Sequence, residues 1–355
     1  MSDQDQAEQL AQQVAEAAEA GTAVRIRGAG TRGFLGRPVD GQTLDVSGHR
    51  GIVNYEPTEL VMTARAGTPL DELEATLTEQ GQMMPFEPPR FGPGATLGGA
   101  IATGLSGPRR PWAGAARDLV LGTRLINGRG EHIRFGGEVM KNVAGYDLSR
   151  PMAGSFGTLG ILLDVSLKLL PRPAAEATRA LEVPMTETYR RVASLQAEGA
   201  PISGAAHDGN RLYLRVSGAE SAVRQAEARL GGEPLSDPAR FWLDLKEHDA
   251  PFFTEGENPL WRVALPPAAE LPELSGAYWL DWGGQQLWVR TALADATVRE
   301  RVAALGGHAT RFRGGDRTGE VFHPLEPGVA ALHGRLKTAL DPEHRFNPGR
   351  LDPEG

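Results

Sequence analysis

The chain has 355 residues, of which 40% are hydrophobic and 23% charged, and its formal net charge is −8 at pH 7. This acidic balance argues against a nucleic acid or an anionic membrane surface as the main partner, because either would favour a basic face. The sequence contains no cysteine, which excludes a thiolate nucleophile, a cysteine-ligated iron–sulfur cluster and disulfides within it.

The N-terminal stretch lacks the features of a secretion signal. It begins MSDQDQAEQ, acidic where a signal peptide would be basic, and residues 3–20 then place apolar side chains at helical spacing up to Gly21. The longest apolar run, residues 159–170, is broken by charged residues and is too short to span a bilayer. We expect a cytoplasmic protein that reaches the inner face of the cell membrane only peripherally, through partners.

A first glycine-rich loop follows a short strand predicted at 23–27. The strand runs into Gly28-Ala29-Gly30-Thr31, whose main-chain amides and threonine hydroxyl can be aimed at a phosphate. No third glycine stands at the dinucleotide-binding spacing of a Rossmann unit, and the sequence has no GxxxxGK[ST] motif. The loop therefore predicts a phosphate site of another kind.

Short strands and helices then alternate irregularly. We expect strands at 43–46, 52–55, 60–64 and 161–170, a helix from Pro69 to Gly81 with Thr68 as its N-cap, and a hairpin of 119–126 with 131–135. This succession lacks the regular strand–helix alternation of a doubly wound sheet. It predicts an α+β fold.

Residues 91–118, FGPGATLGGAIATGLSGPRRPWAGAARD, form a second glycine-rich stretch. A turn that exposes successive amides, followed by a small-residue helix from about Thr96, would form a nest for phosphate oxygens. The alternative is a loop that is rich in glycine because it turns sharply. Further glycine segments occur at 142–147 and 154–160. Several converging loops fit one long dinucleotide better than a single phosphate ester.

The pattern changes after Pro171-Arg172-Pro173. Two similar successions of strands and helices, at 178–230 and 261–312, predict a ferredoxin-like sheet with helices on one face. Three tryptophans fall close together in it, and we interpret them as packing residues rather than flavin-stacking groups: Trp279, Trp282 and Trp288. The predicted units are a first α+β domain over 1–172, a cap domain over 173–335, and a tail over 336–355 that returns to the first domain.

Five segments together resemble the FAD-binding fold shared by vanillyl-alcohol oxidase, p-cresol methylhydroxylase and the FAD-linked 2-hydroxy-acid dehydrogenases. They are residues 27–31 (RGAGT), 93–99 (PGATLGG), 114–118 (GAARD), 154–160 (GSFGTLG) and 347–349 (NPG). Within that family the chain is most similar to the FAD-binding subunits of bacterial glycolate oxidases, through 140–150 (MKNVAGYDLSR), 240–245 (RFWLDL) with His248, and Leu336-Lys337 before Asp341-Pro342. The resemblance implies a two-subdomain FAD-binding fold of the p-cresol methylhydroxylase type with a ferredoxin-like cap.

The resemblance also implies cofactor contacts. Around the pyrophosphate it places Arg27, Gly28, Ala29, Gly30, Thr31, Pro93, Gly94, Ala95, Thr96, Leu97, Gly98 and Gly99. Near the isoalloxazine or ribityl chain it places Gly104, Ser106 and Gly107, and beside the adenosine and flavin it places Gly154, Gly157, Thr158, Gly160 and Ile161. The first two loops offer no histidine or cysteine for a covalent link, so the FAD is expected to be non-covalent.

By the same resemblance the chain is an FAD-dependent oxidoreductase that acts on CH–OH donors and takes part in oxidising glycolate, a 2-hydroxy acid, to glyoxylate. Its implied partners are a catalytic FAD subunit and an iron–sulfur subunit that receives the electrons. The alternatives are a mainly structural docking subunit or a stand-alone dehydrogenase of the D-lactate type. The family's histidine-rich metal motif has no counterpart here, so no metal site is predicted and the stand-alone enzyme is disfavoured.

Catalytic residues remain unassigned except for one candidate. His248 lies in the motif of the closer relatives and could act as a general base near the flavin. The alternative is a histidine at a helix C-terminus that bonds a carbonyl.

Overall fold

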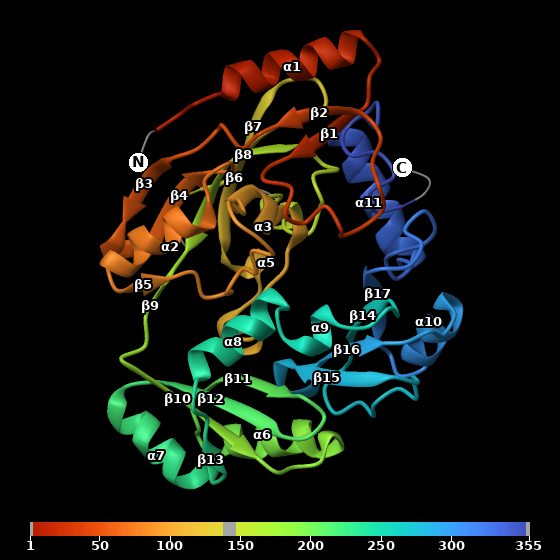
Figure 1. Ribbon diagram of the computed structural model, residues 1–355. Helices are drawn as coiled ribbons and strands as arrows, with labels where there is room; N and C mark the ends of the chain where they lie inside the picture. Colours follow the sequence, from red (N-terminus) through yellow and green to blue (C-terminus); the bar gives the residue numbers. More distant parts are fainter. Residues whose placement is uncertain (1–2, 138–146, 353–355) are drawn as a thin grey trace.

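The computed structural model describes residues 3–137 and 147–352 (Figure 1). Its upper part in Figure 1 holds a two-stranded parallel sheet and a five-stranded antiparallel sheet, and its lower part holds an eight-stranded antiparallel sheet. Helices are interspersed among the strands rather than alternating regularly with them. The α+β prediction is confirmed.

The apolar side chains spaced at helical intervals in the N-terminal stretch form the buried face of the first helix. Helix α1 (Ala7–Glu19) buries Leu10 and Val14 against β1 (Val24–Arg27) and β2 (Gln42–Asp45), which run parallel. The chain of β1 ends where the glycine loop begins, so the packing of α1 on this sheet fixes the position of the loop.

In the five-stranded sheet, the strand that comes last in the sequence lies at the centre. The order is β3 (Ile52–Glu56), β4 (Val61–Arg65), β8 (Ile161–Lys168), β6 (Val120–Ile126) and β7 (His132–Gly136). Strands β6 and β7 form the hairpin predicted around Asn127. Polar side chains inside β8 are buried and paired, since Ser166 bonds Thr63 at 2.8 Å and Asp164 bonds Arg124 at 2.6 Å.

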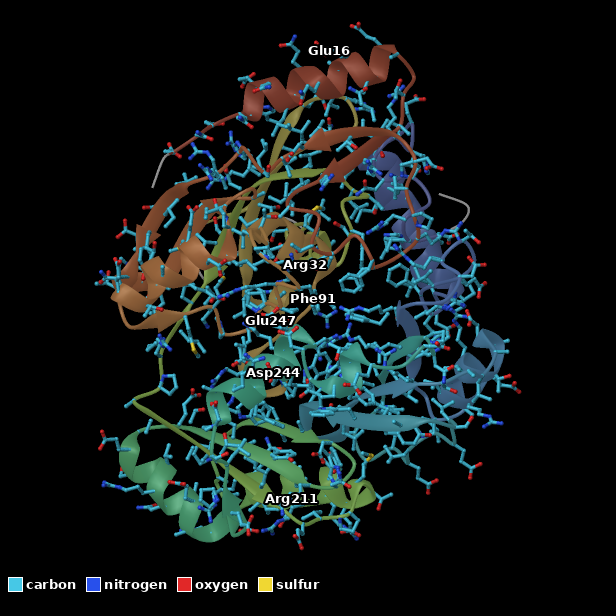
Figure 2. All side chains as sticks on the ribbon, in the orientation of Figure 1. Glu16, Arg32, Phe91, Arg211, Asp244 and Glu247 are labelled. Carbon is cyan, nitrogen blue, oxygen red and sulfur yellow. The ribbon has the colours of Figure 1, made fainter. Side chains whose placement is uncertain are left out.

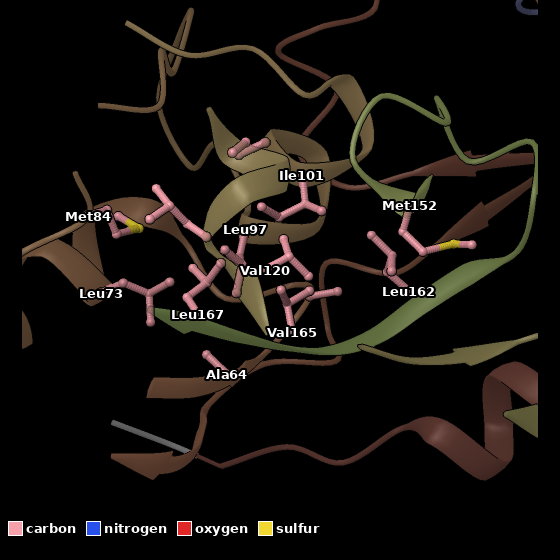
Figure 3. Close-up of a cluster of buried hydrophobic side chains, with 14 of the residues drawn as sticks. Ala64, Leu73, Met84, Leu97, Ile101, Val120, Met152, Leu162, Val165 and Leu167 are labelled. Atoms are coloured by element: carbon pink, nitrogen blue, oxygen red, sulfur yellow. The ribbon is translucent and has the colours of Figure 1, made fainter. Parts of the chain in front are cut away.

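Helices α2 (Leu70–Glu79) and α3 (Leu97–Thr103) pack on this sheet with the shared core that Figure 3 shows, in which Leu73, Leu97 and Val165 are buried. One cap differs from the prediction. Thr68 does not cap α2, whose N-cap is Pro69, because the Thr68 hydroxyl accepts from the Gly51 amide at 2.9 Å. A long-range bond to the sheet edge thus replaces the local cap.

Shorter elements connect these layers and the lower part. They are β5 (Gln82–Met83), which pairs with β9 (Leu170–Pro171), the helices α4 (Arg110–Ala113) and α5 (Ala116–Leu119), and the 3-10 turns Pro57–Glu59, Arg150–Met152, Met185–Glu187 and Trp282–Gly284.

The eight-stranded sheet consists of two halves that each follow a ferredoxin-like strand order. The first half contains β10 (Ala175–Leu181), α6 (Thr188–Ala197), β11 (Ile202–His207), β12 (Leu212–Gly218), α7 (Glu220–Leu230) and β13 (Glu233–Pro234). The second contains β14 (Leu260–Ala264), β15 (Ala277–Asp281), β16 (Gln286–Arg290), α10 (Asp295–Ala303) and β17 (His308–Arg313). In space the order is β13-β10-β12-β11-β15-β16-β14-β17, so the halves meet at β11 and β15.

Two more helices cover the face of this sheet that is turned toward the upper part: α8 (Pro238–Glu247) and α9 (Pro251–Thr254) (Figure 1). They share a buried cluster with Trp279 and Trp288, which are cross-strand neighbours, so these tryptophans pack at the junction. The prediction placed helices on one face and did not include this second layer.

The last helix, α11 (Pro327–Leu340), brings the chain end back to the upper part (Figure 1). Leu340 lies in the same core as α2 and α3, and Phe346 forms a parallel bridge with Val24. The division of the chain at 172 and 335 stays a prediction. No helix within the described ranges combines the length and the apolar character that crossing a lipid bilayer requires.

Candidate cofactor site

A cavity of about 510 Å³ lies in the upper part, where the first glycine loop meets the start of α3 and the chain end. Its lining includes ten of the residues predicted from the sequence: Arg27, Gly28, Ala29, Gly30, Thr31, Thr96, Gly98, Gly99, Gly157 and Gly160. Segments that are far apart in the sequence thus converge on one cavity, as a long ligand would require.

The first glycine loop supplies free main-chain donors. Among the described residues, no oxygen accepts a hydrogen bond from the amides of Gly28, Ala29, Gly30 or Thr31. The loop also presses closely on α3, because a Cβ on Gly28 would lie 2.6 Å from the Oγ1 of Thr96. Successive unpaired amides at a cavity wall form an anion site.

The start of α3 behaves differently from the prediction. Thr96 is the N-cap, and its hydroxyl accepts from the Gly99 amide at 3.2 Å. The next two amides are also used, since Leu97 donates to the Thr68 carbonyl at 2.9 Å and Gly98 donates to the Ala66 carbonyl at 2.7 Å. The expectation that these amides open toward phosphate is therefore wrong, because the neighbouring strand end takes two of them.

Gly98 is required by packing. A Cβ at this position would lie 2.8 Å from the Ala66 Cβ and 3.0 Å from its carbonyl oxygen. We expect Gly98→Ala to lower the free energy of unfolding by about 1–3 kcal/mol, the usual cost of overpacking, in urea titrations followed by tryptophan fluorescence.

The control for this prediction is Gly334→Ala in the exposed part of α11, where an added methyl group meets no described atom within 4 Å. That substitution should raise stability by up to about 1 kcal/mol through helix propensity. Equal, small effects of the two substitutions would contradict the packing role of Gly98.

Other predicted contacts lie behind the cavity wall rather than on it. Ala95, Leu97 and Ile161 are buried in hydrophobic cores. The Thr158 hydroxyl donates to the Ser155 carbonyl at 2.7 Å. The remaining predicted residues that do not line this cavity are Pro93, Gly94, Gly104, Ser106, Gly107 and Gly154. For two of them the reason is mutual packing, because a Cβ on Gly104 would lie 2.9 Å from the Gly154 amide nitrogen.

A second, small cavity of about 20 Å³ lies at the junction of the two parts and is lined by Ser106, Gly107 and His248. Gly107 accepts a hydrogen bond from the Trp282 indole at 3.1 Å. Residues predicted from separate motifs are therefore brought together, but away from the large cavity.

His248 ends α8 in the left-handed conformation and is 5% exposed. Its ring stacks on Phe253 at 4.2 Å, and its Nδ1 has no hydrogen-bond partner among the described residues. Burial and the nearby Arg313 hold the pKa of His248 well below its usual range, so the imidazole is neutral. The expected bond from the ring to a carbonyl does not describe this arrangement, and the role of a base stays a prediction.

Positive charge surrounds the large cavity. Its lining carries five arginines, Arg25, Arg27, Arg32, Arg317 and Arg350, against a single carboxylate, Asp40. Of these arginines, the sequence indicated only Arg27 as a site residue. Arg317 and Arg350 lie close to 300 positions beyond the loop, and no local pattern signals their approach.

The chain end closes this site. Asn347 accepts from the Ile26 amide at 2.9 Å and donates to the Phe156 carbonyl at 2.7 Å. Arg350 donates to the Arg37 carbonyl at 2.8 Å. The terminal NPG motif thus ties β1 to the loop before β8.

Two predictions fall partly outside the described residues: the 140–150 motif, whose residues 140–146 are not described, and the glycine segment 142–147, of which only residue 147 is. Within the described ranges, no three or more histidine or acidic side chains form a group that could hold a metal ion.

Comparisons with known proteins agree on the family of this chain. The FAD binding domain family matches residues 5–136. The chain is 49% identical to the glycolate oxidase subunit GlcE of Escherichia coli over 347 residues, which covers 98% of this chain and 97% of that protein. It is 33% identical to the glycolate oxidase subunit GlcD of Bacillus subtilis, over 43% of this chain and 33% of that one.

The fold has solved counterparts. An alkyldihydroxyacetonephosphate synthase superposes with a TM-score of 0.65 and 15% identity, over 96% of this chain and 74% of that chain. At this identity the likeness concerns the fold alone. It agrees with the p-cresol methylhydroxylase-type architecture expected from the sequence.

Proposed function

Because the chain belongs to the same family as the glycolate oxidase subunit GlcE, we propose that it holds FAD non-covalently in a multi-subunit enzyme that oxidises glycolate to glyoxylate. The chain is an FAD-binding oxidoreductase, and FAD is its cofactor. The proposed partners are a catalytic FAD subunit and an iron–sulfur subunit, located at the inner face of the cell membrane.

One observation carries the proposal: free loop amides and an excess of arginines line the same cavity. A diphosphate needs both, because several charge-assisted hydrogen bonds must offset its desolvation. Gly28 to Thr31 would bind the diphosphate, and Asn347 would hold β1 and the loop before β8 in position. FAD, when bound, supplies a ring that accepts two electrons from a CH–OH donor.

The protein's own residues would position the flavin and exclude water. Phe156 and Ala102 contribute apolar surface to the cavity, and Arg317 donates to the Gly33 carbonyl at 3.0 Å, which fastens the loop from the cap side. His248 lines the small cavity at the junction and not the cofactor cavity, so it would serve as a base only for a hydroxy acid bound at that junction.

A second candidate is a docking subunit whose flavin lies off the electron path. The described residues that line the large cavity include no histidine, so no imidazole base stands at its wall. This observation favours a flavin that depends on a partner for its chemistry.

The test is anaerobic addition of glycolate to the chain alone and to its complex, with an FAD analogue of shifted absorption loaded on this chain. We expect this flavin to bleach only in the complex. If the complex turns over while this flavin stays oxidised, the redox role is wrong and the docking role holds. Acid precipitation should leave the yellow colour in the supernatant, whereas a yellow pellet would show a covalent link.

A further inference from the structure

Arg32 is a buried cation that forms no ion pair with a described carboxylate, although the charge of Glu247 acts on it. Its side chain is 7% exposed and lines the large cavity, and its Nε has no hydrogen-bond partner among the described residues. One terminal nitrogen donates to the Pro89 carbonyl. Burial lowers the pKa of Arg32 to about 10, so the guanidinium still carries its proton at neutral pH.

Glu247 is the carboxylate whose charge acts on Arg32, but its close contacts are with other groups. Glu247 on α8 accepts from the amides of Arg90 at 2.7 Å and Phe91 at 2.9 Å, and pairs with Lys246 at 3.1 Å. Figure 2 shows Arg32 in the centre of the molecule, above Phe91 and Glu247. No described carboxylate lies within ion-pair distance of Arg32. An isolated buried charge is costly, so an anion is expected to complete this site.

The other arginines of the cavity are less suited to bind an anion. Arg317 and Arg350 already donate to main-chain carbonyls. Arg25 donates to the Thr43 hydroxyl at 2.6 Å and is exposed, as is Arg27. Arg32 is thus the buried arginine of this wall that keeps an unpaired donor.

Gly99 makes room for this guanidinium. A Cβ at position 99 would lie 3.2 Å from the Arg32 Nη1 and 3.2 Å from the Thr96 Oγ1. Both contacts are tighter than most side chains tolerate. The glycine at 99 is therefore explained by the neighbouring arginine, whereas Gly98 is explained by Ala66.

We propose that Arg32, admitted by Gly99, is the cation that binds the diphosphate of the cofactor. The proposal rests on the proposed function, because it takes FAD as the ligand. It assigns the charge compensation at the diphosphate to this side chain and not to the amides that open α3.

The experiment titrates apo-protein with FAD, ADP and riboflavin by calorimetry, for wild type, Arg32→Gln and Arg32→Lys. ADP carries the diphosphate without the flavin, and riboflavin carries the flavin without phosphate. We expect Arg32→Gln to weaken FAD and ADP binding about 10- to 100-fold, the range for a charge-assisted bond. Riboflavin binding should be unchanged, and Arg32→Lys should recover part of the loss.

The control is Arg224→Gln, an exposed arginine on α7 that does not line the cavity, which should change FAD binding less than about threefold. Since Arg32 forms no ion pair with a described carboxylate, Arg32→Gln should also raise the Tm of the apo-protein. A lower Tm together with unchanged ADP binding would make Arg32 a structural residue and overturn the proposal.

These measurements distinguish a failure of the Arg32 role from a failure of the proposed function. If wild type binds FAD but Arg32→Gln binds FAD and ADP equally well, the role of Arg32 is wrong and the proposed function stands. If the loss appears with riboflavin and not with ADP, the guanidinium meets the flavin ring and not the diphosphate. If wild type binds no FAD, the proposed function fails, and the role of Arg32 with it.

A double-mutant cycle tests Gly99. Gly99→Ala should weaken ADP binding in the wild-type background and have a smaller effect in the Arg32→Gln background, because the close contact with the guanidinium is then gone and only the one with Thr96 remains. Equal effects in both backgrounds would show that Gly99 acts independently of Arg32.

Discussion

Replacement of Lys337 by methionine is expected to lower the free energy of unfolding by about 3–5 kcal/mol, the usual cost of breaking a buried ion pair. The Lys337 ammonium donates to Asp341 at 2.7 Å, to the Thr158 carbonyl at 2.8 Å and to the Phe346 carbonyl at 3.1 Å. Lys337 is 4% exposed and Asp341 is fully buried. The variant would leave the carboxylate of Asp341 without its counter-ion, and urea unfolding at pH 7 measures the loss.

The chain offers a matched pair for comparison. Arg240 and Asp244 on α8 have the same spacing and the same 2.7 Å distance, but the arginine is mostly exposed. Arg240→Met should cost no more than about 1 kcal/mol. Combining Lys337→Met with Asp341→Asn should recover part of the stability by removing the orphaned charge. A loss below about 1 kcal/mol for Lys337→Met alone would show that water reaches this pair.

The C-terminal segment connects the Lys337–Asp341 pair to the cofactor site. Lys337 bonds the carbonyl of Phe346, whose neighbour Asn347 lines the large cavity. Loosening of this contact should therefore weaken FAD retention together with stability.

Stability is expected to fall as the pH rises from about 4 to about 7 because of Asp281, and Asp281→Asn should abolish that part of the dependence. The carboxyl is 3% exposed and accepts from the Trp282 amide at 2.7 Å. Burial, with a contribution from the charge of Glu87, raises the pKa of Asp281 from 3.8 to about 7.

The direction of this pH dependence follows from how many protons the folded and the unfolded chain bind. Below pH 4 the carboxyl is protonated in both states. Between pH 4 and 7 the unfolded chain loses this proton and the folded chain keeps it, so the unfolded state is favoured increasingly. At about 1.4 kcal/mol per unit, wild type should lose about 4 kcal/mol relative to Asp281→Asn between pH 4 and pH 8.

Urea titrations of both proteins at several pH values measure this difference. Asp164→Asn is a control of opposite sign. Burial raises the pKa of Asp164, but the neighbouring His49 ring and the hydrogen bond from Arg124 outweigh burial and hold this pKa below its usual value, so its contribution to stability is lost on acidification. A pH-independent difference between wild type and Asp281→Asn would mean that Asp281 is ionised in the folded protein.

Many elements were predictable because their signals are local. The apolar period of α1 and the Asn127-Gly128 turn between β6 and β7 depend on residues a few positions apart. The central place of β8 depends on pairing with β4, a hundred residues earlier, and no local pattern encodes that. The Thr68 cap was wrong for the same reason, since Gly51 competes for the hydroxyl.

The residues of the site also fall into those set by local sequence and those set by distant segments. The glycine-x-glycine-threonine loop is readable because free amides come from the backbone conformation of four successive residues. The second loop carries an equally suggestive pattern, yet the amides of Leu97 and Gly98 at the start of α3 are taken by the carbonyls of Thr68 and Ala66. Arg317 reaches the cavity from the segment after β17, and only the folded chain brings it there.

The sequence by itself determined the α+β class, the family, the FAD cofactor and the position of the first glycine loop, because each depends on short motifs in a fixed order. The tertiary structure decided which glycines face the cavity, which serve packing, and which cation stands unpaired. These outcomes depend on carbonyls, carboxylates and side-chain volumes that approach from distant segments, so a burial or a missing partner is visible only once the chain has folded.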